Sequence, residues 1–106
     1  MLTQQAAIEK VYSFVQTVKK SGIQLKLVVL YGSFSRNEQH EDSDIDVALV
    51  ADKFTGNGFK DFDIFGKTLI QKQFSIIQPR TYKTCNFTPD KDPFVEEILR
   101  TGIEIV

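Results

Sequence analysis

The sequence predicts a single α/β (α+β) domain, built on a small mixed sheet of three to four strands flanked by helices. Apolar residues recur at helical spacing over residues 4–20, whereas the apolar runs in residues 25–31 and 44–51 are nearly continuous, as in strands covered on both faces. The chain has 106 residues, of which 42% are hydrophobic and 25% charged. That composition suits one soluble domain with one core, so we expect residues 1–106 to form one unit.

Charge and composition exclude several classes of protein. The net charge of -1 is too low for bulk electrostatic binding of nucleic acid. No apolar run is long enough to span a membrane, and the N-terminus lacks the apolar stretch of a signal peptide. A single cysteine, Cys85, rules out an internal disulfide and fits a reducing compartment. We therefore expect a cytoplasmic protein.

The first half of the chain predicts one helix and two strands. The helix spans residues 4–20, with Thr3 as its N-cap and Gly22 just after its end. Its core-facing stripe is expected to consist of Ala7, Ile8, Val11, Tyr12, Val15 and Val18. A strand over residues 25–31 follows, and a polar segment leads to a second strand over residues 44–51, which we expect beside the first.

The second half is less regular. A helix is expected over residues 59–72, and its inner side would consist of Phe62, Phe65, Leu69 and Ile70. A third strand is expected over residues 74–78, where Pro79 would stop it, and an irregular polar stretch follows. The Asp-Pro pair at 92–93 predicts the start of a closing helix with the stripe Phe94, Ile98 and Leu99. Residues 103–106 would add a short last strand.

The end of the first strand carries a candidate phosphate site, Gly32 and Ser33. A glycine after a buried strand lets the backbone turn sharply and lets a ligand approach closely. If residues 34–38 form a turn of helix, its first N–H groups would point at an anion. By itself the Gly-Ser pair is weak evidence, because it also occurs in ordinary turns.

The start of the second strand carries a candidate metal site, Asp44 and Asp46. Residues i and i+2 of a strand face the same way, so the two carboxylates would lie side by side while Ile45 and Val47 enter the core. Like charges this close repel each other, and a shared Mg²⁺ is one reason to keep them. The alternative is a pair of solvent-facing acids at the end of an edge strand.

Together these residues form a more specific pattern. The string Gly-Ser-x-x-Arg-x6-Ser-Asp-Ile-Asp-Val, between two apolar strands, resembles the signature of the nucleotidyltransferase superfamily typified by DNA polymerase beta. It is most similar to the minimal nucleotidyltransferases of the MNT/HEPN type, which are often encoded beside a helical HEPN-domain protein. The order of elements resembles that family across nearly the whole chain.

The resemblance implies roles for the residues of the phosphate segment. Gly32 and Ser33 would hold the β- and γ-phosphates of a nucleoside triphosphate, with ATP as the favoured nucleotide. Arg36 would fix the turn or neutralise the phosphates. The family usually has Gly after this arginine, and Asn37 is a mild replacement because Asn tolerates positive φ.

The resemblance also implies the metal chemistry. Asp44 and Asp46 would bind one or two Mg²⁺ ions, and Ser43 would orient the first aspartate. An acceptor hydroxyl would attack the α-phosphorus in line and release pyrophosphate, with the metal stabilising the attacking and leaving oxygens. The family usually has a third carboxylate on the next strand, and the matching position here is expected to be Ser75. A neutral hydroxyl cannot supply general-base catalysis, which is commonly worth roughly 10² to 10⁴-fold.

Other polar residues are weaker candidates. Asp61 and Asp63 are expected on a solvated helix face. The less favoured interpretation is that one of them replaces the missing third carboxylate. His40, in the polar loop, is expected to be solvated rather than to touch substrate.

Three functions remain open at this stage. The first is an enzyme that transfers a nucleoside monophosphate, favoured as AMP, to a hydroxyl of a partner protein or of a small molecule such as an aminoglycoside. The second is a catalytically weakened nucleotidyltransferase fold that pairs with a HEPN-type protein as an antitoxin would, and the apparent loss of an acid at Ser75 favours it. The third is a small α/β domain whose acids are incidental.

Overall fold

The computed structural model describes residues 2–69 and 71–106. Its main helices and strands are, in chain order, α1 (Gln4–Lys20), β1 (Leu27–Tyr31), β2 (Ile45–Ala51), α2 (Gly58–Leu69), β3 (Ile77–Lys83), α3 (Phe94–Thr101) and β4 (Ile103–Glu104). Two short 3-10 helices, η1 (Lys72–Phe74) and η2 (Thr84–Asn86), flank β3. The expected place of Ile70 on a helix inner face lies outside the described residues.

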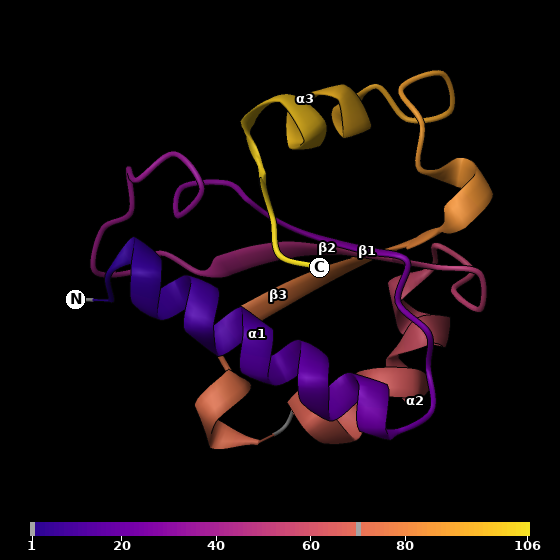
Figure 1. The fold of residues 1–106 in the computed structure, drawn as a ribbon, viewed down its shortest axis with the longest axis horizontal. Coiled ribbons are helices and arrows are strands. Elements are labelled where there is room, and N and C mark those ends of the chain that lie inside the picture. Colours follow the sequence, from indigo (N-terminus) through magenta and orange to yellow (C-terminus); the bar gives the residue numbers. More distant parts are fainter. Residues whose placement is uncertain (1, 70) are drawn as a thin grey trace.

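The strands form one mixed sheet in the order β3-β2-β1-β4. β1 pairs antiparallel with both β2 and β4, whereas β2 pairs parallel with β3. Figure 1 shows α1 and α2 on one face of this sheet and α3 on the other. The predicted fold class, a small mixed sheet flanked by helices, is confirmed. Within the described ranges, none of the helices has the length and hydropathy that a membrane crossing requires.

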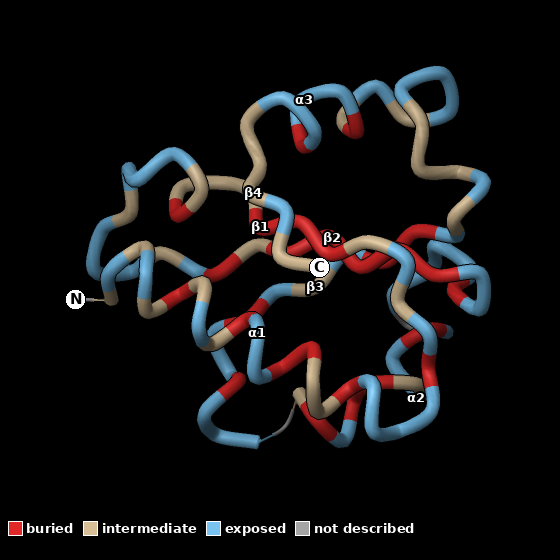
Figure 2. The backbone as a smooth tube through the Cα atoms, in the orientation of Figure 1, coloured by how far each residue is buried: buried red, intermediate tan, exposed pale blue. Residues whose placement is uncertain are grey.

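The two faces of the sheet carry two buried clusters. On β2, Ile45, Val47 and Leu49 pack toward α1 and α2, while the alternate residues Ala48 and Val50 pack toward α3. Figure 2 shows buried residues along the central strands β1 and β2, and at intervals along α1 and α2. Because β2 is covered on both faces, its apolar run is continuous rather than alternating.

The first helix follows the sequence prediction closely. α1 spans the expected residues, and the N–H of Ala6 donates to Thr3 Oγ1 at 3.1 Å, so Thr3 is the N-cap. The expected stripe is wrong at Tyr12, whose side chain is 52% exposed. Phe14 is buried instead, since it falls three and four residues from other members of the stripe.

The predicted third strand is wrong in its bounds. Ser75 does not lie on a strand: it is exposed and directly follows η1. The strand begins at Ile77 and continues through Pro79, which we expected to end it. β3 is an edge strand, where the missing N–H of a proline is tolerated. The residue that pairs with Asp46 is therefore Gln78.

The other two helices also differ from the prediction in which side chains they bury. On α2, Phe65 is buried but Phe62 is 44% exposed and lies over Gly66. On α3, Leu99 is exposed, and Val95 and Ile98 face the sheet. These helices are short, so the inner face depends on how each meets the sheet more than on the pattern itself.

Candidate nucleotide and metal site

The segment after β1 turns back sharply at Gly32, whose φ is +79°. It is a hydrogen-bonded turn rather than a regular helix: the N–H of Arg36 donates to the Gly32 carbonyl at 3.4 Å, and the N–H of Glu38 donates to the Ser33 carbonyl at 2.8 Å. Asn37 has φ +55°, which is the left-handed conformation. We expected from the sequence that Asn would tolerate this conformation in place of Gly. We call residues 32–38 the phosphate turn.

Two contacts fix the phosphate turn to the body of the protein. Phe34 is buried in the core between the sheet and α1. The side-chain amide of Gln4 donates to the carbonyls of Phe34 and Ser35, at 2.9 and 3.2 Å. Sequence reasoning missed Gln4, because no local pattern connects two residues that are 30 positions apart.

The fold brings the phosphate turn against the predicted metal ligands. Tyr31, the last residue of β1, pairs with Asp46 on β2. Gly32 then lies so close to this aspartate that a Cβ atom at Gly32 would overlap Asp46 Oδ2 and lie 3.3 Å from Asp46 Cγ. Only a glycine leaves room for the Asp46 carboxylate in this orientation. Asp44 directly precedes β2 and is exposed.

The electrostatics of Asp46 show that the two aspartates interact. Burial raises the pKa of the Asp46 carboxyl, the charge of Asp44 raises it further, and Arg36 acts in the opposite direction. A pair of carboxylates that repel each other favours a bound cation, which would relieve both the burial and the repulsion.

A cavity of about 280 Å³ opens in front of Asp46, between the sheet and α3. It is lined by Tyr31, Gly32, Arg36, Asp46, Phe94, Glu97, Ile98 and Thr101. The rings of Tyr31 and Phe94 meet edge to face at 5.6 Å. Burial, and next the charge of Asp46, raise the pKa of Tyr31 to about 12. The contribution of α3 to this cavity was not evident from the sequence, because it depends on how the closing helix crosses the sheet.

Two predicted site residues make other contacts. Ser43 Oγ accepts a hydrogen bond from the N–H of His40 at 2.9 Å, so it organises the loop before Asp44. Arg36 forms an ion pair with Glu38 at 2.8 Å, with 43% of its own side chain exposed. It remains at the edge of the cavity and within electrostatic reach of Asp46.

The neighbouring strand does not supply a third acid. Gln78 pairs with Asp46, and Arg80 comes two residues later on the same face of β3. The Arg80 guanidinium lies 5.2 Å from the ring centre of Phe94 and 3.8 Å from Asp92. Among the described residues, no group of three or more His, Cys, Asp or Glu side chains is placed to hold a metal ion. The positions at which this strand lacks a carboxylate are therefore Gln78 and Arg80, and not Ser75 as predicted.

Asp61 does not supply the missing third carboxylate, and the expectation that its side chain is solvated is wrong. It is 1% exposed, and its carboxylate accepts hydrogen bonds from Thr81 Oγ1, from the hydroxyl and N–H of Thr55, and from the N–H of Gly56. Burial alone would raise its pKa, but these hydrogen bonds outweigh burial and lower it. Thr81 and Arg80 face opposite sides of β3, so Asp61 lies across the sheet from Asp46.

Comparison with known proteins agrees with this geometry. Residues 4–106 match the family described as Polymerase beta, Nucleotidyltransferase. A candidate nucleotidyltransferase from Sulfolobus solfataricus has a similar structure, with a TM-score of 0.65 and 17% identity over 95% of this chain and 80% of that chain. A comparison with curated proteins finds no match.

A mixed sheet that carries a Gly-Ser turn against Asp46 is the arrangement that the resemblance to nucleotidyltransferases predicts. Because the family match covers nearly the whole chain, the protein belongs to the Polymerase beta, Nucleotidyltransferase family.

Proposed function

We propose that the protein binds a nucleoside triphosphate with Mg²⁺ at the phosphate turn and the aspartate pair, and transfers the nucleoside monophosphate to a hydroxyl. ATP is the favoured nucleotide, and AMP is then the group transferred. The observation that carries the proposal is the contact between Gly32 and Asp46, which leaves no room for a side chain between the turn and the carboxylate. Such close approach suits a ligand that bridges the two.

The residues present fit one magnesium ion. Mg²⁺ prefers oxygen ligands and is usually held by one or two carboxylates together with substrate phosphates, which matches Asp44 and Asp46. When bound, the ion would neutralise charge on the phosphates and on the reacting oxygens. Gln78 and Arg80 offer no carboxylate for a second ion.

The chain's own residues would position the substrate. Gly32 and Ser33 would receive the β- and γ-phosphates at the backbone of the turn, and Arg36 would face them from the edge of the cavity. Gln4 and Phe34 hold the turn in place. The acceptor oxygen would attack the α-phosphorus and form the new P–O bond, while the bond from the α-phosphorus to the oxygen of the β-phosphate breaks. Pyrophosphate would then leave, and the proton of the acceptor hydroxyl would pass to water.

The second candidate is a weakened member of the family that acts as an antitoxin-like binding partner of a HEPN-type protein. The presence of Gln78 and Arg80 where an acid could complete the site favours it. Without a base beside the acceptor, transfer would lose roughly 10² to 10⁴-fold, while nucleotide binding would remain.

One experiment separates the two candidates. The protein is mixed with α-labelled ATP, Mg²⁺ and the product of the adjacent gene. Label on that product that is lost in Asp44→Ala supports the transferase. A stable complex without label, unchanged in Asp44→Ala, supports the binding partner instead.

A further inference from the structure

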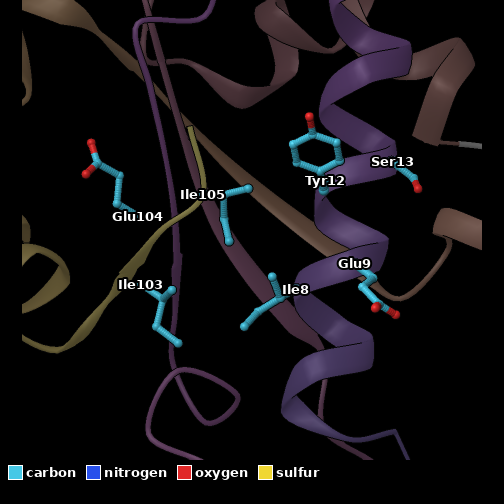
Figure 3. Close-up of a pocket in the computed structure, with 7 residues that line it drawn as sticks. All are labelled: Ile8, Glu9, Tyr12, Ser13, Ile103, Glu104 and Ile105. Carbon is cyan, nitrogen blue, oxygen red and sulfur yellow. The ribbon is translucent and has the colours of Figure 1, made fainter.

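A groove of about 410 Å³ runs between α1 and β4, away from the candidate site. Figure 3 shows Ile103 and Ile105 pointing across it toward Ile8, with Tyr12 above them. Tyr12 is 52% exposed although it lies beside the apolar stripe of α1. The groove is therefore an apolar surface that these residues cover only in part.

One wall of the groove is the edge of the sheet. β4 is the last strand in the order β3-β2-β1-β4. The N–H of Ile105 donates to the Val28 carbonyl at 2.7 Å, so this residue points its backbone toward β1. Backbone groups alternate in direction along an antiparallel strand, and those of Glu104 therefore point outward. An outward edge of this kind can pair with a further strand.

The charged residues that line the groove are of one sign. Among the described residues of its lining these are Glu9 and Glu104, both exposed, with no lysine, arginine or histidine. The Glu104 side chain points away from the groove, on the α3 side of β4 (Figure 3). A residue paired with Glu104 on an added strand would point to that same side, and its neighbours would point into the groove.

We propose that this groove and the β4 edge bind an extended segment of a partner protein, in which a basic residue stands between two apolar residues. The segment would add as a strand beside β4. Its basic side chain would face Glu104, and the two apolar side chains would cover Ile103, Ile105 and Tyr12. This binding is independent of the proposed transfer reaction.

A second copy of the chain fits this edge poorly. Antiparallel pairing of β4 with its own copy, centred on Glu104, would place two glutamates directly opposite each other. Like charges in that position destabilise the pair. The charge pattern therefore favours a different protein over self-association.

The proposal is tested with two blocked pentapeptides, Thr-Val-Lys-Val-Thr and Thr-Val-Glu-Val-Thr, added at millimolar concentration to the full ¹⁵N-labelled protein. We expect the lysine peptide to shift the amide signals of residues 103–106 and to bind roughly 3- to 10-fold more tightly than the glutamate peptide. Glu104→Lys should reverse that preference. Tyr12→Ser should weaken binding, whereas Leu99→Ser, a change at an equally exposed apolar residue of α3, should not.

Three results would overturn the proposal: no shift at β4, equal binding of the two peptides, or a preference that Glu104→Lys leaves unchanged. A concentration-dependent dimer that Glu104→Lys disrupts would assign the edge to a second copy instead. Asp44→Ala should bind the lysine peptide as the natural protein does. A failure of the transferase proposal would therefore leave this result unaffected.

Discussion

Replacing Gly32 with alanine tests whether the phosphate turn and Asp46 depend on each other. Two effects add at this position. The backbone has φ +79°, where a residue with a side chain is strained, and the new Cβ would overlap Asp46 Oδ2. The carboxylate would have to rotate away from the turn, so both the stability of the protein and its cation site should suffer.

The size of the effect follows from these two terms. The left-handed backbone costs a non-glycine residue about 1–2 kcal/mol. Displacing the Asp46 side chain from its rotamer adds about 0.5–1.5 kcal/mol. We therefore expect Gly32→Ala to lower the free energy of unfolding by about 1.5–3.5 kcal/mol. For a domain of this size that corresponds to a fall in Tm of roughly 6–28 °C.

The matched control is Gly56→Ala. Gly56 has φ +88°, but a Cβ there meets nothing within 4 Å, so only the backbone term applies. Urea unfolding of both variants, with and without Mg²⁺, measures the difference. Gly32→Ala should be the less stable of the two and should gain less from Mg²⁺. Equal stability, or an unchanged response to Mg²⁺, would refute the contact with Asp46.

Three further predictions concern individual acids. The pKa of Asp46 is raised in the folded state, so ionisation of this carboxyl lowers the stability of the protein as the pH rises through that pKa. Asp46→Asn should therefore stabilise the metal-free protein at neutral pH. Bound Mg²⁺ should lower the pKa of Asp46, as measured by ¹³C NMR titration. Asp61→Ala should cost about 2–4 kcal/mol in urea unfolding, because it leaves buried donors unpaired, while exposed Asp63→Ala should change stability by less than about 0.5 kcal/mol. The lowered pKa of Asp61 means that its contribution is present near neutral pH and is lost as the pH falls through that pKa, so equal acid sensitivity of the natural protein and Asp61→Ala would contradict it. Gln78→Asp should tighten Mg²⁺ binding by about tenfold, as measured by calorimetry, and Ser75→Asp should not, because only Gln78 pairs with Asp46; the reverse order would contradict the strand register.

The part of the fold that local pattern determines was predictable. The helical spacing of apolar residues and the cap at Thr3 located α1, and two continuous apolar runs located β1 and β2. The sequence also predicted that the strands carrying Gly32 and the aspartates lie side by side, and their pairing brings Gly32 against Asp46. These features depend on residues that lie close together in the sequence or on strands joined by a short connection.

The rest depends on tertiary context. Pro79 lies inside β3 because that strand is at the sheet edge, which the sequence does not reveal. Asp61 is buried because donors from a loop and from β3 converge on it, and Gln4 holds a turn far away in the sequence. Because we expected Pro79 to end the third strand, we placed that strand too early in the sequence. The residue beside Asp46 is therefore Gln78, three positions after the expected Ser75.

The most direct test of the central claim is calorimetric binding of ATP with and without Mg²⁺ to the natural protein and to Asp46→Asn. We expect saturable binding that requires Mg²⁺ and weakens by at least about tenfold, or 1.4 kcal/mol, in the variant. Binding that is equally strong without Mg²⁺, or in Asp46→Asn, would contradict a joint nucleotide and metal site at Gly32 and Asp46.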